Sequence, residues 1–253
     1  MSSYTTISVV REGAVDWLTL NRPERRNAID ATMVRELWAY FDELQTDYAC
    51  RVVMLRGAGQ GFCAGLDLTW FKEPGAAMPR GDTETGPGPS LGDIVLKMRS
   101  CPQAIVALVH GAACGGGFSF ALAADIRIAG RSARMNVAFV KIGLSGCELG
   151  TSYFLPRMLG TSVAAELMMT GRFIHADRAL ATGLVSEVVD DDQLEATGRA
   201  LAADLLAASP IGLRKTKETM TRASEIEDLG AVIGLEERTQ LACMQATGFA
   251  QPA

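Results

Sequence analysis

The sequence predicts an α/β fold, and three observations support this prediction. Two largely apolar runs, residues 51–57 and 104–111, end in glycine, as strands buried on both faces of a parallel sheet commonly do. Segments with helical spacing lie beside both runs in the sequence. The order of strand, glycine-rich turn and helix recurs along the chain, which is typical of α/β proteins.

The amino-terminal region predicts a β-hairpin followed by a helix. The β-type runs TTISVVREG and AVDWLTLNRP meet at Glu12 and Gly13, and the second run ends at Pro23. Asp30 is then placed to cap a helix. The apolar residues of this helix fall at spacings of three and four, and they are Val34, Leu37, Phe41 and Leu44.

The rest of the chain predicts a loop, a second unit of strand and helix, and a helical tail. Residues 72–90 are rich in proline and glycine, so we expect a surface loop or lid there rather than a domain boundary. The strand at 104–111 leads into an apolar helix at 118–125. From Asp191 onward the pattern is helical, with segments at 194–208, at 210–220 and around 226–244.

Composition excludes several classes of protein. The 29 acidic residues exceed the 24 basic ones, and lysine and arginine form no block, so an extended surface for nucleic acid or an anionic membrane is not indicated. The first residues lack the pattern of a secretion signal, and no run of about 18 uncharged apolar residues occurs. We therefore expect a soluble cytoplasmic protein. Six cysteines without a CxxC pair and two distant histidines predict neither a disulfide framework nor a metal site.

Two glycine-rich turns follow the two predicted strands. Residues 111–117 read GAACGGG and open a helix whose first N–H groups can hold an anion or a developing oxyanion, although tight packing would explain the same glycines. A dinucleotide fingerprint would need glycine or alanine in place of Phe120, and a P-loop would need lysine in place of Gly117. The other turn, residues 57–68, reads GAGQGFCAGLDL. One free N–H from each turn would make a two-donor oxyanion hole.

Four motifs together carry a resemblance to a known family. The chain contains, in order, NRPERRNA, GFCAGLDL, HGAACGGGF and LMMTGR, and over nearly its whole length it resembles the crotonase (enoyl-CoA hydratase/isomerase) family. The resemblance implies a crotonase-type spiral of ββα units over residues 1–195 and a C-terminal helical region over 196–253 that packs in a trimer or dimer of trimers. It also implies an acyl-CoA substrate whose thioester oxygen is bound by the N–H groups of Leu66 and Gly116.

The chain departs from the best-known hydratases of this family at both catalytic glutamates, which fall on Ser119 and Phe139. Serine needs an activating partner to act as a base near neutral pH, and phenylalanine cannot transfer a proton. Glu148 in GLSGCELGTS is the remaining candidate, because ELGT is similar to the DVGT of dienoyl-CoA isomerases. The resemblance places Glu148 beside the acyl chain. A structural role, complementing the dipole of the helix that follows, is the alternative.

Other residues are predicted to bind substrate or to support the site. Arg26 resembles the basic residue that the family places near the CoA phosphates, although a solvated loop arginine fits equally well, and Asp67 is expected to cap the segment after the oxyanion turn. His110 is expected to tie turn backbone together. Trp70 and Phe71 either line the acyl pocket or pack in the core. The predicted substrate-binding set is Arg26, Ala64, Asp67, Leu68, Ser119 and Phe139.

These features predict an enzyme of the enoyl-CoA hydratase/isomerase type that uses no metal and no cofactor beyond the CoA of its substrate. A single carboxylate can move a proton between C2 and C4, which makes an isomerase the simplest interpretation. Hydration stays open, with Glu148 and Ser119 positioning a water. The alternative is a non-catalytic acyl-CoA-binding protein, because both usual glutamates are absent.

Overall fold

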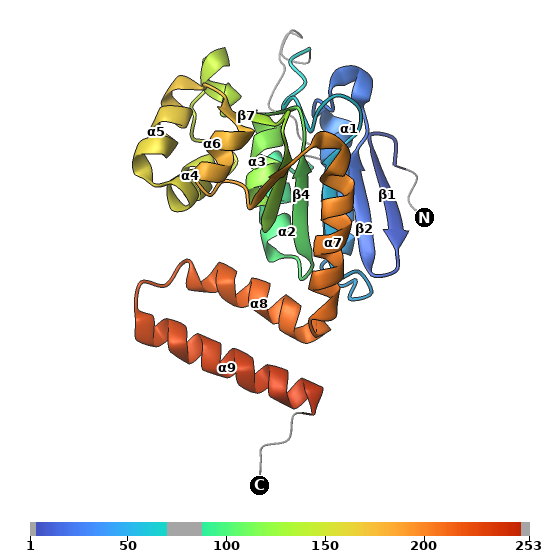
Figure 1. Ribbon diagram of the computed structural model, residues 1–253, viewed down its shortest axis with the longest axis vertical. Coiled ribbons are helices and arrows are strands. Elements are labelled where there is room, and N and C mark those ends of the chain that lie inside the picture. Colours follow the sequence, from blue (N-terminus) through green and yellow to red (C-terminus); the bar gives the residue numbers. More distant parts are fainter. Residues whose placement is uncertain (1–3, 70–87, 249–253) are drawn as a thin grey trace.

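The computed structural model describes residues 4–69 and 88–248, and these residues form the predicted α/β architecture (Figure 1). The larger sheet has the strand order β1-β2-β3-β4-β6-β9. β1 and β2 form the predicted antiparallel hairpin, and every later neighbour in this sheet pairs in parallel. Its strands are β1 (Ile7–Glu12), β2 (Val15–Leu20), β3 (Val52–Gly57), β4 (Ala104–Val109), β6 (Ile126–Gly130) and β9 (Glu187–Val189).

Helices and a small second sheet complete the fold. The small sheet contains β5 (Ala112–Cys114), β7 (Arg134–Asn136) and β8 (Ile174–His175). The helices are α1 (Ala31–Glu43), α2 (Leu91–Ser100), α3 (Gly116–Ala123), α4 (Thr151–Leu159), α5 (Thr161–Thr170), α6 (Ala176–Ala181), α7 (Leu194–Ala207), α8 (Pro210–Ala223) and α9 (Leu229–Thr247). Short 3-10 segments are η1 (Pro23–Arg25), η3 (Ala138–Ile142) and η4 (Asp191–Gln193).

The central strands β3 and β4 of the larger sheet are buried on both faces, as their unbroken apolar runs predicted. Because side chains alternate along a strand, Val53 and Leu55 of β3 join the core under α1, α2 and α3, whereas Val52 and Met54 join the core under α7. β4 divides its side chains in the same way. The sheet therefore fixes the carboxyl ends of β3 and β4 next to each other, and the two glycine turns begin there.

Two predicted helix starts, at Asp30 and at Pro210, are confirmed, and a side chain caps each helix there. The Asp30 carboxylate accepts a hydrogen bond of 2.8 Å from the N–H of Met33 and caps α1, whose four predicted apolar residues are buried. Pro210 begins α8, and the hydroxyl of Ser209 accepts from the N–H of Gly212. Of the predicted loop at 72–90, residues 72–87 lie outside the described part of the chain, and Ser90 caps α2.

The helical tail has two parts. α7 packs on the sheet through Leu194 and Ala202, so the predicted division between residues 195 and 196 falls inside a helix of the body. α8 and α9 extend away from the sheet and lie beside each other (Figure 1). The division into two regions stays a prediction. Among the described residues, no helix has the length and apolar character needed to cross a membrane.

Candidate active site

The turns that follow β3 and β4 are joined by backbone hydrogen bonds. Cys63 donates its N–H to the carbonyl of Ala112 at 3.0 Å, and Cys114 donates to the carbonyl of Cys63 at 2.9 Å. Cys63 and Ala113 thus form a parallel bridge outside the named strands. The bridge sets the two turns in a fixed register, so residues that follow it in one turn lie close to those that follow it in the other.

Gly65 lets the two turns approach each other closely. Its φ is +86°, and a Cβ atom there would lie 2.6 Å from the carbonyl oxygen of Cys114 and 3.5 Å from the amide nitrogen of Gly116. A side chain at this position is therefore excluded both by contact and by backbone conformation. The contact also places the residue before Leu66 directly against Gly116.

The amides of Leu66 and Gly116 have no hydrogen-bond acceptor among the described residues, although amides on either side of them do. Asp67 donates to the carbonyl of Ile29, and Gly115 donates to the carbonyl of Asn136. Gly116 begins α3, where the first N–H groups of a helix have no intrahelical partner. The structure thus brings together the two residues predicted to donate to a thioester oxygen, and both donors are unpaired.

The segment that contains Glu148 forms a tight turn over the start of α3. Thr151 donates its hydroxyl to the carbonyl of Gly146 at 2.7 Å and accepts from the N–H of Glu148 at 3.1 Å. Leu149 has a φ of +51°, which is rare for a residue with a branched side chain. Its Cδ1 atom would lie 3.5 Å from a Cβ on Gly116. The turn therefore packs Leu149 against Gly116, one of the two residues with an unpaired amide.

Glu148 is half-buried as a residue, and its carboxylate makes no hydrogen bond or ion pair with any described residue. It does not cap the following helix, because the cap of α4 is Gly150 and no side chain bonds to the first-turn amides. Only the backbone of Glu148 holds the turn. Its side chain carries a charge with no described structural partner, beside a turn that lies on Gly116.

Ser119 and Phe139, which occupy the positions of the usual glutamates, both lie beside the glycine turn. Ser119 is fully buried in α3, and its hydroxyl donates to the carbonyl of Gly115 at 3.3 Å. Phe139 lies in η3, and its Cε1 atom would lie 3.4 Å from a Cβ on Gly115. Among described residues the hydroxyl of Ser119 has no basic partner that could activate it.

The remaining predicted residues surround the turn after β3. Ala64 donates its N–H to the carbonyl of Arg26 at 2.9 Å, so the backbone of Arg26 borders this turn while its side chain is exposed. Asp67 is buried and accepts hydrogen bonds from Thr69 and Arg22. Burial alone would raise the pKa of Asp67, but these hydrogen bonds outweigh it and lower the pKa below its usual value. Leu68 is exposed.

Leu149 and Gly150 line a cavity of about 900 Å³, together with residues of α2, α4 and α8. Its volume is typical of sites for small organic ligands, which occupy about 300–1,000 Å³. The apolar side chains that line it include Val95, Leu96, Phe154, Met158, Leu213 and Met220. The sequence did not predict a role for these residues. Their helical spacing was visible in the sequence, but nothing in it showed that three distant helices meet around one cavity.

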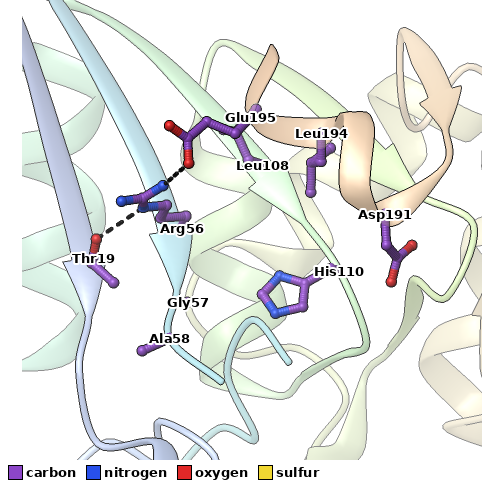
Figure 2. A pocket seen from close by; sticks show the side chains of 9 residues that line it. All are labelled: Thr19, Arg56, Gly57, Ala58, Leu108, His110, Asp191, Leu194 and Glu195. Carbon is purple, nitrogen blue, oxygen red and sulfur yellow. Dashed lines mark hydrogen bonds and ion pairs between the residues drawn. The ribbon is translucent and has the colours of Figure 1, made fainter. Parts of the chain in front are cut away.

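His110 lies outside this arrangement. Its Nε2 atom donates to the carbonyl of Gly59 at 2.9 Å, so it ties two turns together as predicted. The imidazole faces a separate cavity of about 340 Å³ on the α7 face of the sheet, together with Asp191 and Glu195 (Figure 2). This smaller cavity lies on the face of the sheet opposite to α3. Its position excludes His110 as a partner for Glu148.

The cysteines near the turns behave as buried apolar side chains. Burial raises the pKa of Cys63 to about 12, and burial likewise raises the pKa of Cys114. Neither thiol is therefore prepared to act as a nucleophile near neutral pH. Within residues 4–69 and 88–248, no three His, Cys, Asp or Glu side chains gather in a way that could hold a metal ion. Trp70 and Phe71 lie outside the described residues.

The chain is similar in sequence to one family of known proteins. The sequence model of the family described as "Enoyl-CoA hydratase/isomerase" matches residues 11–249. The "Probable enoyl-CoA hydratase EchA12" of Mycobacterium tuberculosis is 39% identical over 240 residues, covering 92% of this chain and 79% of the relative. The "1,2-epoxyphenylacetyl-CoA isomerase" of Escherichia coli is 35% identical over 242 residues, covering 92% and 88%.

Solved structures share the fold over nearly the whole chain. A putative enoyl-CoA hydratase from Thermobifida fusca, crystallised in complex with CoA, matches with a TM-score of 0.84 at 31% identity. The match covers 97% of this chain and 95% of that one. The predicted crotonase-type α/β fold is confirmed.

Proposed function

The chain belongs to the enoyl-CoA hydratase/isomerase family, and we propose that it binds the thioester oxygen of an acyl-CoA through Leu66 and Gly116 and moves protons with Glu148. The observation that carries this proposal is that two unpaired amides meet beside a turn whose carboxylate has no partner among the described residues. The bridge between Cys63 and Ala113 brings the amides together, and Leu149 packs the Glu148 turn on Gly116.

The chemistry follows from the two donors. Hydrogen bonds to the thioester oxygen stabilise the negative charge that develops when a proton leaves C2, so they bind the enolate more tightly than the ground state. In comparable enzymes the removal of one such donor raises the barrier by about 3 to 4 kcal/mol. Glu148 takes the proton from C2 and returns it at C4, and the double bond moves from between C3 and C4 to between C2 and C3.

Isomerisation needs fewer groups than hydration, and the surroundings of Ser119 favour it. A hydratase must also hold a water molecule, and Ser119 was the predicted second partner for that water. Its hydroxyl is fully buried and is already bonded to the carbonyl of Gly115. One carboxylate without a partner is sufficient to transfer a proton within the substrate. We therefore propose an isomerase, with hydration as the competing reaction.

The proposal extends to the substrate and the assembly. The acyl group lies in the cavity that Leu149 lines, and the exposed Arg26 contacts the CoA phosphates. CoA enters as part of the substrate, and no other cofactor takes part. α9 has no buried residue and exposes several apolar side chains, which supports an assembly that covers them. We propose that this assembly is a trimer or a dimer of trimers and that the protein is cytoplasmic.

Deuterium incorporation tests the catalytic assignment. We expect wild-type protein in heavy water to exchange protons at C2 and C4 of enoyl-CoA substrates, as followed by NMR or mass spectrometry. Glu148→Gln keeps the shape of the side chain but removes the base, so we expect exchange to slow by about 10²–10⁴-fold while acyl-CoA binding is retained. Glu43→Gln, at the end of α1, removes a carboxylate far from the turns and serves as the control.

Two results would distinguish a wrong assignment of Glu148 from an absence of enzymatic activity. Exchange by Glu148→Gln at the wild-type rate would show that another group moves the proton. A wild-type protein that binds acyl-CoA but incorporates no deuterium would be a non-catalytic binding protein.

A further inference from the structure

The large cavity is lined by one face each of α2, α4 and α8, and α8 is the most C-terminal of these helices. Residues spaced by three or four positions along α2, α4 and α8 point into the same space, as expected when one face of each helix is turned inward. On α8 the lining residues include Leu213, Lys217, Met220 and Thr221, with Ser224 just after the helix. The cavity therefore lies between the body of the protein and a helix of the tail.

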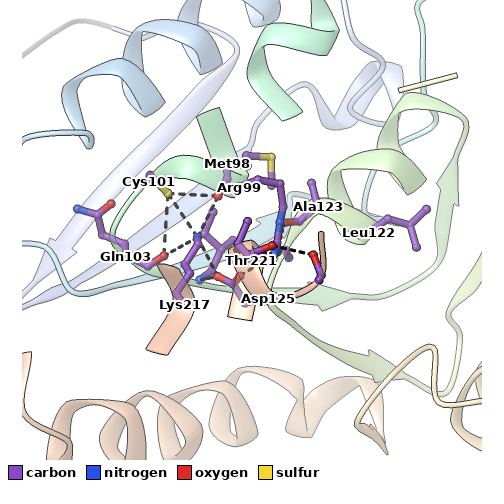
Figure 3. Close-up of polar contacts among 12 residues, drawn as sticks. Met98, Arg99, Cys101, Gln103, Leu122, Ala123, Asp125, Lys217 and Thr221 are labelled. Carbon is purple, nitrogen blue, oxygen red and sulfur yellow. Dashed lines mark hydrogen bonds and ion pairs between the residues drawn. The ribbon is translucent and has the colours of Figure 1, made fainter. Parts of the chain in front are cut away.

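Lys217 anchors α8 to the body. Its Nζ atom donates to the carbonyls of Met98 at 2.9 Å and Gln103 at 2.8 Å, and it pairs with Asp125 at 2.9 Å (Figure 3). These contacts join α8 to the end of α2 and to the segments that lead into β4 and β6. A buried ammonium is costly unless its donors are satisfied, and here three acceptors meet it.

Lys217 is the only buried residue of α8, and it is 7% exposed. The other anchors are also polar and lie on the same face of the helix. Arg99 donates to the hydroxyl of Thr221 at 2.9 Å, and the hydroxyls of Tyr153 and Ser224 lie 2.9 Å apart. These polar contacts hold α8 on the body together with Leu213, which packs against the core under α7.

The cations of the cluster around Lys217 find acceptors within the protein. Asp125 is paired with both Arg99 and Lys217, so the two cations of the cluster already have a carboxylate partner. Leu213 and Met220 of the same helix also line the cavity. Together with Val95 and Leu96 of α2 and Phe154 and Met158 of α4, they give the cavity an apolar lining that suits a hydrocarbon chain.

We infer that Lys217 is a positioning residue that holds α8 as the distal wall of the acyl site, and that this wall gives the protein its preference for long apolar acyl groups. The inference rests on the proposed function, because it assumes that the thioester lies at Leu66 and Gly116. A short acyl group ends near Leu149 and does not reach α8. A long one passes between α2 and α4 and contacts Leu213 and Met220.

Binding of saturated acyl-CoA thioesters tests this inference without requiring turnover. The probes are butanoyl-CoA and dodecanoyl-CoA, titrated calorimetrically into the full-length protein. Lys217→Met removes the anchor but keeps an apolar stem, and we expect it to raise the Kd for dodecanoyl-CoA by at least about tenfold. That change corresponds to lost contact with about two methylene groups. The Kd for butanoyl-CoA should change less than about twofold, since no such contact is lost.

Two further variants keep the test decisive if Lys217→Met folds poorly. Met220 is 67% exposed, so Met220→Trp should leave folding intact while it narrows the cavity, and it should weaken only the binding of the long thioester. Lys217→Arg keeps the positive charge, so it should bind dodecanoyl-CoA more tightly than Lys217→Met does, although less tightly than the wild type. Lys215→Met removes a lysine of the same helix that pairs with Glu218 and does not line the cavity, so it serves as the matched control.

Steady-state kinetics supply the second readout. For long enoyl-CoA substrates, Lys217→Met should raise KM and leave kcat within about twofold, because the oxyanion donors and Glu148 are unchanged. Equal losses for both chain lengths, or unchanged binding of dodecanoyl-CoA by Lys217→Met and Met220→Trp, would overturn the inference. If the wild-type protein bound neither thioester, that result would instead contradict the proposed function on which the inference rests.

Discussion

The two ends of the proposed site are built in different ways. At the thioester end, backbone hydrogen bonds join two turns, and a side chain is excluded where Gly65 meets Cys114. At the acyl end, side chains hold a helix whose only buried residue is a lysine. The difference teaches that the reacting end is fixed by the course of the main chain, whereas the acyl end depends on a few side chains. Substitutions should therefore change substrate preference more readily than the position of the oxyanion donors.

Gly65→Ala should have the largest effect on this comparison, because it disrupts the thioester end directly. A methyl group would lie 2.6 Å from the carbonyl oxygen of Cys114, and the φ of +86° is unfavourable for alanine. Either the turn moves or the donors separate, so we expect kcat/KM to fall by about 10²–10³-fold, as in the loss of an oxyanion donor. Steady-state kinetics on an enoyl-CoA substrate measure this.

Gly13→Ala is the matched control for Gly65→Ala. Gly13 also has a positive φ, of +60°, but nothing lies within 4 Å of its missing side chain. Its substitution should cost stability of about 1 kcal/mol through backbone strain and should leave kcat/KM unchanged. If Gly65→Ala behaved like Gly13→Ala, the close approach of the two turns would not be needed for activity.

Asp67→Asn should have the next largest effect, and it is pH-dependent. The folded-state pKa of Asp67 lies below its usual value of 3.8. The stabilisation from its ionised form is therefore complete above that value and is lost as the pH falls through the folded-state pKa. At neutral pH we expect Asp67→Asn to lower the free energy of unfolding by about 1.5 kcal/mol, through weaker hydrogen bonds to Arg22 and Thr69.

Denaturant unfolding at several pH values checks this expectation. The difference in unfolding free energy between wild type and Asp67→Asn should shrink as the solution is made acidic, because protonation removes the same charge from the wild type. A difference that stays constant, or grows in acid, would mean that the charge of Asp67 does not hold the turn.

Arg26→Ala should have the smallest effect, since it acts at the exposed edge of the site. Loss of one solvent-exposed cation should raise the Kd for free CoA by up to about fivefold at low salt, and by less at high salt. Arg25→Ala is the control. Arg25 is also exposed, but the N–H of Ala64 donates to the carbonyl of Arg26 and not to that of Arg25. Equal effects of both substitutions would indicate general attraction of charge instead of a phosphate contact at Arg26.

The two glycine turns at the thioester end could be predicted from the sequence, because strands that end in glycine and a helix start with free N–H groups are local features. The choice of Leu66 and Gly116 as the two donors came from the family resemblance, since tight packing explained the same glycines. Alternating burial in β3 and the cap at Asp30 are likewise local. Glu148 was found through resemblance, whereas the left-handed conformation of Leu149 beside it had no sequence signal.

The acyl end could not be predicted, because contacts between distant segments determine it. Lys217 and Met98 are 119 residues apart in the sequence, and α8 reads as a polar, solvent-facing helix. A lysine in such a helix is expected to be exposed. Its burial depends on acceptors from Met98, Gln103 and Asp125, which only the folded topology brings together.

A crystal structure with a bound, unreactive acyl-CoA analogue tests the central claim most directly, through the distances from the thioester oxygen to the amide nitrogens of Leu66 and Gly116. We expect both distances to be about 2.7–3.1 Å, with the Glu148 carboxylate next to C2 and C4. A thioester oxygen beyond hydrogen-bond distance of either amide, or an acyl chain on the side of the sheet that carries His110, would contradict the proposed site.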